Sequence, residues 1–201
     1  RLAQQVEERG HEETDDPVER ARRTAVRAQM GFGSASACGG NSGFRTDTRR
    51  KYGTAQHNWA AYPEALGAIG ERFSGVLIEN RDAIEVMQAH DGHDTLFFVD
   101  PPYVHDTRCM RNRGGYRHEL DDAAHQRLLD AVRAVDGMVV LCGYRSDLYD
   151  AALADWQRHE TTARISGGRG TSLRTEVVWL NSSCTAELQR SRGDLFAGVP
   201  A

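Results

Sequence analysis

Apolar runs alternate with helical stretches in this sequence, and that order limits its fold more than any other feature. Three short apolar runs each precede a helical stretch, and two strand-like runs around a glycine-rich turn follow. This order predicts an α/β sheet of parallel strands that ends in an antiparallel hairpin. The expected strands are residues 76–79, 95–99 and 138–142, with a hairpin of 160–165 and 175–180. The expected helices are residues 17–30, 63–73, 83–89, 121–135 and 146–154.

Parallel strands add further expectations about this sheet. Right-handed crossovers place helices on both of its faces. The uninterrupted apolar run at residues 95–99 is typical of a strand buried on both faces. Ligands of such sheets bind beyond the carboxyl ends of the strands, where Asp82, Asp100 and Gly143-Tyr144 are expected to lie.

Composition divides the chain into four segments. These are an acidic head at 1–16, a helical and loop insert at 17–74, the α/β core at 75–181, and a small polar tail at 182–201 that we expect to be disordered. The four cysteines have no paired spacing and fit a reducing compartment. No apolar run reaches the roughly 18 residues of a membrane helix, and no signal peptide opens the chain. We therefore expect a cytoplasmic protein with no membrane partner.

Charge is distributed unevenly along the chain. The formal net charge of −4 argues against nucleic acid when it is taken as an average. Residues 20–51, however, carry eight basic side chains and one acidic one, a net +7, and four arginines follow within residues 108–117. Two interpretations fit the basic segment: a solvated helix face with a flexible loop, or a surface that contacts phosphates.

Asp100-Pro101-Pro102-Tyr103 directly follows the expected strand at 95–99 and predicts a binding site. Two prolines turn the chain out of the sheet and donate no N–H, so their carbonyls are open to a ligand. A carboxylate, a free carbonyl and an aromatic ring together fit a planar molecule with an exocyclic amino group. Its N–H groups would bond to the Asp100 carboxylate and the Pro101 carbonyl, and its ring would stack on Tyr103. Taken alone, the two prolines would only end a strand.

These residues resemble the Dam-type N6-adenine DNA methyltransferases, especially the DNA adenine methylases of phages and prophages. Other segments are similar to that family in the same order, from about Glu19 to Asn181. They are Asn80-Arg81-Asp82, Tyr116-Arg117-His118-Glu119, Gly143-Tyr144, Leu148-Tyr149 and residues 174–181. The resemblance implies a Rossmann-like methyltransferase that uses S-adenosylmethionine to methylate adenine N6 at specific sites in double-stranded DNA, as in restriction-modification. Oligomeric state stays open.

The resemblance also implies roles for single residues. Asp100, Pro101, Pro102 and Tyr103 would hold the target amine, and Asp82 and Ala83 would contact the cofactor together with Asp100. The insert at 17–74 takes the place of a target-recognition region, which favours the phosphate-contact interpretation. The candidate DNA contacts are Arg23, Arg27, Arg45, Arg49, Arg50, Lys51, Arg108, Arg113 and Tyr116.

The chemistry of the target amine agrees with this assignment. Adenine N6 is a poor nucleophile because its lone pair is delocalised into the ring. Two acceptors on its hydrogens favour a pyramidal nitrogen whose lone pair points at the sulfonium methyl. The protein then contributes positioning and electrostatics, and needs neither a covalent cysteine nor a metal.

His90-Asp91-Gly92-His93-Asp94 contains residue types that bind metals. It is expected in a turn between a helix and a strand, whereas metal ligands need a scaffold on which they converge. We interpret it as a polar turn and predict no metal site.

Two elements of the family are missing from the sequence. A glycine-rich loop wraps the cofactor's amino-acid end there, and an acidic residue after the next strand binds its ribose. Gly31-Phe32-Gly33 follows an arginine-rich helix instead of a buried strand and matches this loop weakly. In the family these two elements follow the first and second strands of the sheet, which would lie between the expected strands at 76–79 and 95–99. We therefore expect the first strands to precede Arg1, and cofactor binding by this chain alone to be weak.

Two alternative functions stay open at this point. The same chemistry could act on an RNA base or a protein amide, although the basic insert is then harder to explain. A catalytically inactive remnant that only binds DNA is suggested by the missing cofactor loop.

Overall fold

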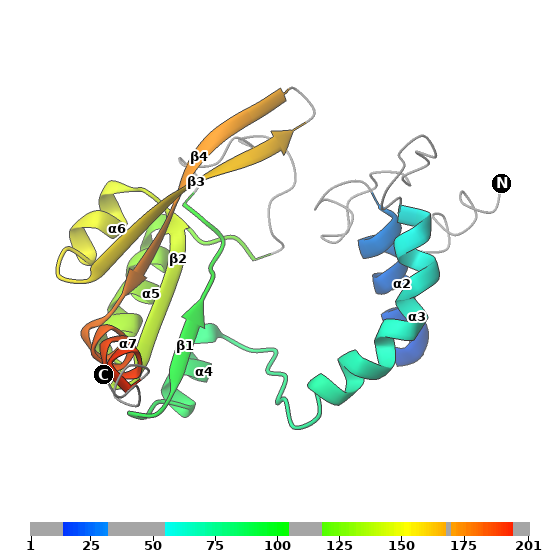
Figure 1. Cartoon of the computed structure of the whole chain (residues 1–201), viewed down its shortest axis with the longest axis horizontal. Coiled ribbons are helices and arrows are strands. Elements are labelled where there is room, and N and C mark those ends of the chain that lie inside the picture. Colours follow the sequence, from blue (N-terminus) through cyan, green and yellow to red (C-terminus); the bar gives the residue numbers. More distant parts are fainter. Residues whose placement is uncertain (1–13, 32–54, 105–117, 168–169, 195–201) are drawn as a thin grey trace, which may run out of the picture. The chain divides into compact units, whose positions relative to one another are not determined.

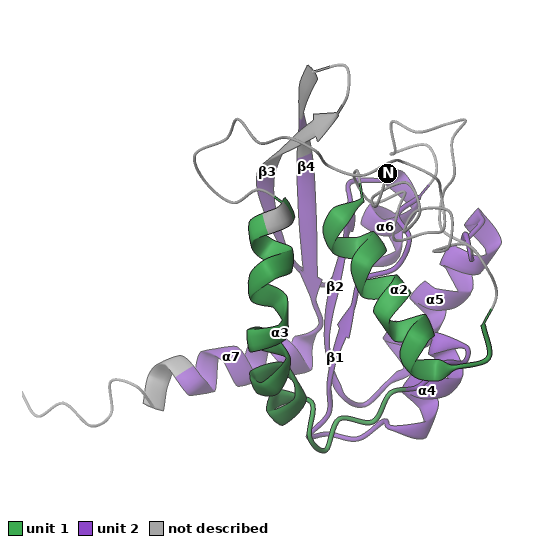
Figure 2. Cartoon of the chain, turned by 90° about the vertical axis from the view of Figure 1, so that its right-hand side faces the viewer, with its two compact units in different colours: residues 1–78, 112–117 green, residues 79–111, 118–201 purple. Residues whose placement is uncertain are grey.

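The computed structural model describes residues 14–31, 55–104, 118–167 and 170–194. Those up to Ile78 belong to one compact unit and those from Glu79 onward to a second (Figures 1 and 2). The described elements of the first unit are α2 (Pro17–Met30) and α3 (Ala55–Arg72). Those of the second are α4 (Ala83–Ala89), β1 (Leu96–Val99), α5 (Asp122–Ala134), β2 (Met138–Tyr144), α6 (Asp147–Ala152), β3 (Gln157–Gly167), β4 (Gly170–Leu180) and α7 (Ser182–Asp194).

Helix α2 begins where local signals predict it. The Asp16 side chain accepts a hydrogen bond from the backbone N–H of Val18 at 2.9 Å, and Pro17 occupies the first turn. α2 packs against α3, and Val26 and Ala55 are buried within this first unit.

Helix α3 begins at Ala55 instead of near Pro63, so the expected start was wrong. The eight residues from Ala55 to Tyr62 contain neither glycine nor proline and continue the helix backward. Pro63 lies inside it, where the missing N–H costs one backbone hydrogen bond. The rings of Trp59 and Tyr62 stack one turn before that point, with centroids 5.8 Å apart.

The second unit contains a mixed four-stranded sheet in the order β1-β2-β4-β3. β1 and β2 are parallel, and β4 is antiparallel to both β2 and β3. The α/β class and the terminal hairpin are confirmed, as are the strands expected at 95–99 and 138–142, which form as Leu96–Val99 and Met138–Tyr144. Two register pairs position the site: Val99 pairs with Leu141, and Tyr144 pairs with Glu176.

The core of this unit lies between one sheet face and three helices. α4, α5 and α6 contribute apolar side chains to a single buried cluster with alternate residues of β2 and β4. Its fully buried members include Leu129, Val139, Leu141 and Trp179. Figure 2 shows α7 on the opposite side of the sheet from α5.

The other face of β1 is open in the described residues. Phe97 and Val99 pack against the core, whereas Leu96 and Phe98 are 56% and 70% exposed. The expectation that this strand is buried on both faces was therefore wrong. The residues of β1 are all apolar, but only those on one face pack against the helices; those on the other face are exposed.

The strand expected at residues 76–79 does not form. Val76, Leu77 and Ile78 are exposed, and no described strand forms a ladder with them. A short apolar run becomes a strand only where a neighbour satisfies its backbone N–H and C=O groups. Residues 76–79 have the side chains of a strand without that partner.

The tail expected to be disordered is helical as far as it is described, so that expectation was wrong for residues 182–194. α7 begins directly after Asn181, whose Oδ1 accepts a hydrogen bond from the backbone N–H of Cys184 at 2.9 Å. Asn181 is buried and also bonds to the backbone of Val139 in β2 and of Gly137 just before that strand. This side chain joins the start of α7 to the sheet.

Candidate active site

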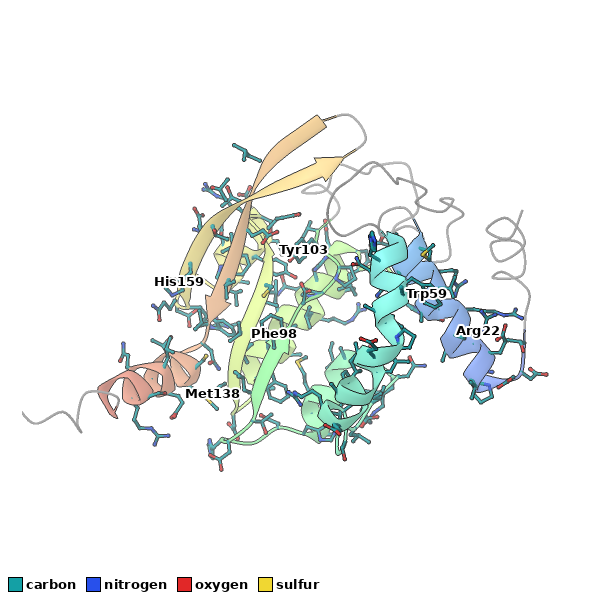
Figure 3. The ribbon with its side chains drawn as sticks, turned by 45° about the vertical axis from the view of Figure 1, so that its right-hand side comes forward. Arg22, Trp59, Phe98, Tyr103, Met138 and His159 are labelled. Carbon is teal, nitrogen blue, oxygen red and sulfur yellow. The ribbon has the colours of Figure 1, made fainter. Side chains whose placement is uncertain are left out.

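The candidate active site lies at the carboxyl ends of β1 and β2, the edge where ligands of such sheets bind. Asp100 follows the last residue of β1, and Pro101, Pro102 and Tyr103 continue from it with their surfaces half-buried. Figure 3 labels Phe98 on β1 and Tyr103 beyond its end. These four residues thus lie at the carboxyl edge of the sheet.

Strand alternation determines which side chains share the open face with Asp100. Successive side chains point to opposite faces, and Val99 packs on the core, so Asp100 belongs to the face opposite α5. On β2, Leu141 and Gly143 are buried, which places Cys142 and Tyr144 on that same open face. The parallel register continues from Val99 and Leu141 to bring Asp100 level with Cys142.

Tyr103 contacts the residue that follows β1 and the last residue of β2. A side-chain hydrogen bond joins it to Asp100. Its ring meets the ring of Tyr144 edge to face, with centroids 4.5 Å apart and planes at 74°. Burial, reinforced by the negative charge of Asp100, raises the pKa of the Tyr103 hydroxyl well above its usual range. Tyr103 therefore stays neutral and can donate a hydrogen bond at all physiological pH values.

Glu176 completes the set from β4. It pairs with Tyr144, and directly opposed residues of an antiparallel pair share a face. Burial, together with the charges of Asp100 and Glu176, raises the pKa of the Cys142 thiol. Two carboxylates, a thiol and two tyrosine rings thus gather on one face. Asp100 and Tyr103 could be predicted from the sequence, whereas Glu176 and Cys142 could not, because only the strand register brings them there.

Asp82 and Ala83, the candidate cofactor residues, lie at the start of α4. The Asp82 side chain is exposed and accepts hydrogen bonds from the backbone N–H groups of Ile84 and Glu85 at 2.8 and 3.4 Å. It acts as the N-cap of α4. Both of these N–H groups donate to the same oxygen, Oδ1.

Two of the candidate DNA contacts lie in the described residues. Arg23 is largely covered and pairs with Glu19 at 2.8 Å, and Arg22 pairs with the same carboxylate at 2.6 Å. Hydrogen bonds from these two arginines, that of Arg22 first, lower the pKa of Glu19 to about 2. Arg27 is half-buried on the same helix. The other candidates, Arg45, Arg49, Arg50, Lys51, Arg108, Arg113 and Tyr116, lie outside the described residues.

The turn at residues 90–94 lies between α4 and β1 and bonds to the backbone just before β2. The Asp91 carboxylate accepts hydrogen bonds from the backbone N–H groups of Asp136 at 2.9 Å and Gly137 at 3.0 Å. These backbone bonds, that of Asp136 first, lower the pKa of Asp91. Within the part of the chain that the structure describes, no group of three histidines, cysteines or carboxylates could hold a metal ion.

A polar hollow opens at the opposite end of the sheet from Asp100. It lies beside the first residues of β1 and β2 and the helix that follows β4, and is lined by His93, Asp94, Asp136, Met138, Ser183, Glu187 and Arg190. Arg190 pairs with Glu187 there. Asp100 and Tyr103 lie at the carboxyl ends of the strands, so the hollow is separate from the candidate active site.

A comparison with protein-family models matches residues 40–164 to the D12 class N6 adenine-specific DNA methyltransferases. That match covers more than half of the chain, including Asp82 and the whole of Asp100–Tyr103. The chain belongs to this family. A search of curated proteins found no match.

Membership of the D12 class confirms the resemblance inferred from the sequence. The protein is an enzyme that transfers a methyl group from S-adenosylmethionine to N6 of adenine in DNA. The description of this family names adenine in DNA, and neither an RNA base nor a protein amide. Among the described helices, none is both long and apolar enough to cross a membrane.

Proposed function

We propose that this D12-class methyltransferase acts on adenine in double-stranded DNA, and that Asp100, Pro101, Pro102 and Tyr103 hold the target base. The observation that carries the proposal is the position of Asp100 and Tyr103. They meet on the open face at the carboxyl end of β1, joined by a hydrogen bond and flanked by Tyr144. A base in a duplex must leave the stack to reach such an edge, at a cost of a few kcal/mol.

Each side chain has a distinct task in holding the base. The Asp100 carboxylate accepts one N–H of the amine, and the Pro101 carbonyl accepts the other. A carboxylate offers about four lone-pair positions, so Asp100 can keep its bond from Tyr103 while it receives the amine. Stacking on Tyr103 is worth roughly 1–3 kcal/mol, comparable with the cost of extruding the base.

The described residues fit the charge of S-adenosylmethionine. A sulfonium is a cation, and cations are attracted to carboxylates and to the faces of aromatic rings. Asp100, Glu176 and Tyr103 supply both kinds of group on one face. When bound, the cofactor supplies an electrophilic methyl group. Asp82 and Ala83 would hold its adenine end, and Asp82 has an exposed carboxylate for that contact.

The basic insert supplies the DNA contacts in this proposal. Residues 17–74 form the target-recognition region, and the net +7 of residues 20–51 neutralises phosphates. The insert precedes the catalytic core at 75–181, for which we propose a Rossmann-like methyltransferase fold. Both belong to a cytoplasmic enzyme with access to duplex DNA.

Methyl transfer from labelled S-adenosylmethionine tests the substrate. DNA isolated from cells that lack N6-methyladenine is offered as duplex and as single strands, with RNA and protein as comparisons. We expect label at adenine N6 of the duplex. The assay uses the full-length protein, with any residues that precede Arg1. Label confined to single strands, RNA or protein would overturn the proposal.

Substitution of Asp100 tests the site. Asp100→Ala removes the charged acceptor, and we expect methyl transfer to fall at least about a hundredfold. Asp100→Asn keeps an acceptor oxygen without the charge and should lose less. Affinity for duplex DNA should stay within a few-fold in both variants because the phosphates bind elsewhere. Near-normal turnover of Asp100→Ala would exclude Asp100 from the site.

A further inference from the structure

Tyr144 connects the proposed base-stacking ring to the rigid part of the sheet. It is the last residue of β2, which runs parallel to β1. Tyr103 lies beyond the end of β1, after two prolines and outside the strand ladder. The two rings meet edge to face at 4.5 Å, an arrangement favoured because the positive edge of one ring approaches the negative face of the other.

The backbone of Tyr144 is held by pairing with β4 and by the packing of the residue before it. Glu176 of β4 pairs with it across the sheet. The preceding residue, Gly143, is buried on the core face, where an added Cβ would lie 3.3 Å from the ring of Trp179. Trp179 is fully buried and packs against Tyr149 with ring centroids 5.4 Å apart. Tyr144 is therefore a fixed point against which a neighbouring ring can rest.

We propose that Tyr144 is a positioning residue for methyl transfer, which holds the Tyr103 ring in the orientation that stacks on the target adenine. This inference rests on the proposed role of Tyr103. A stacked base must also present its amine to Asp100, so the plane of the Tyr103 ring determines where N6 lies. Small displacements of a reacting atom cost large factors in rate, and a ring that can rotate permits them. Tyr144 acts through Tyr103 and does not contact the base.

Two substitutions at Tyr144 in the full-length protein test this role. Tyr144→Ala removes the ring, and we expect kcat/KM for duplex DNA to fall about two- to tenfold, the value of one aromatic pair. Tyr144→Phe keeps the ring and should restore kcat/KM to within about twofold of wild type. Loss of activity in Tyr144→Phe equal to that in Tyr144→Ala would overturn the proposal, because the hydroxyl and not the ring would then matter.

A double-substitution cycle with Tyr103→Leu separates positioning from general damage. If Tyr144 acts only through Tyr103, adding Tyr144→Ala to Tyr103→Leu should cause no further loss of kcat/KM. A folding defect would lower activity in both backgrounds, so additive losses overturn the proposal. Wild-type activity in Tyr144→Ala also overturns it.

The controls show which proposal has failed. Wild-type protein that leaves adenine in DNA unmethylated, or a fully active Tyr103→Leu variant, overturns the proposed function of the site. An impaired Tyr103→Leu variant beside a fully active Tyr144→Ala variant overturns the positioning role alone.

Discussion

The side-chain Oδ1 of Asn181 accepts a hydrogen bond from the backbone N–H of Val139 at 3.0 Å, across 42 residues of sequence. The same oxygen accepts from the N–H of Cys184 at 2.9 Å, and Nδ2 donates to the carbonyl of Gly137 at 2.9 Å. One buried amide thus satisfies backbone groups at the start of β2 and at the start of α7. These contacts link the last described helix to the strand that carries Tyr144.

Asn181→Ala should destabilise the second unit by about 2–4 kcal/mol, because it leaves buried backbone donors and an acceptor without partners. Asn181→Asp is the comparison. It keeps the acceptor for Val139 and Cys184 but places a carboxylate oxygen against the Gly137 carbonyl in a buried position, so we expect it to be destabilising as well, and less so at low pH where the carboxyl is protonated and can donate. Equilibrium urea unfolding followed by circular dichroism measures both. An unfolding midpoint of Asn181→Ala equal to wild type would contradict the structural role of this amide.

Gly137→Ala should also be destabilising, by about 1–3 kcal/mol, because the site has no room for a side chain. A Cβ there would lie 2.8 Å from the carbonyl oxygen of Thr95 and 2.9 Å from the Phe97 ring. Gly92→Ala is the control, since its Cβ would come no closer than 3.8 Å to Thr95 Oγ1. Thermal unfolding should separate the two variants, and equal melting temperatures would contradict the close approach at Gly137.

Local signals explain which elements could be predicted from the sequence. Asp16 with Pro17, Asp82, Asp121 and Ser146 each cap a helix by accepting backbone N–H groups a few residues ahead. Such contacts span three residues or fewer, so the capping residue can be recognised directly in the sequence. α7 also has a cap at Asn181, but that side chain is held by backbone groups of Gly137 and Val139 at the start of β2, which no local pattern reveals.

Contacts between distant segments explain what sequence reasoning missed. The apolar run at 76–79 has strand composition, but a strand needs a partner. Leu96 and Phe98 look like core residues because apolarity does not show which face is covered. At the site, Asp100 and Tyr103 could be predicted because they belong to the four residues that directly follow a strand. Glu176 lies 76 positions after Asp100, and only the register of β2 with β4 brings it to that edge.

The basic insert predicts a salt dependence for DNA binding. Arg49 and Arg50 lie outside the described residues, so this expectation follows from charge alone. Replacing both with Gln should weaken binding and flatten the plot of log K against log salt by up to about two units. Arg127→Gln, an exposed position on α5, should leave the slope unchanged. Titrations by fluorescence anisotropy at several salt concentrations measure the slopes, and an unchanged slope in the double variant would assign these arginines to solvent.

The Cys142 thiol provides a test of the site that does not depend on activity. Burial and the charges of Asp100 and Glu176 raise its pKa, so the thiolate that reacts with iodoacetamide forms only at high pH. Asp100→Asn and Glu176→Gln each remove one negative charge, which should lower that pKa and speed alkylation severalfold at pH 8. Cys184 is the internal control, because burial alone raises the pKa of its thiol.

Peptide-level mass spectrometry measures both cysteines in the same sample. Below its pKa the alkylation rate of a thiol rises about tenfold per pH unit and then levels off. The plateau for Cys142 should move to lower pH in the two variants, and the profile of Cys184 should stay where it is in wild type. If Glu176→Gln leaves the Cys142 profile unchanged, Glu176 does not share the open face with Asp100, and the register-based assembly of the site is wrong.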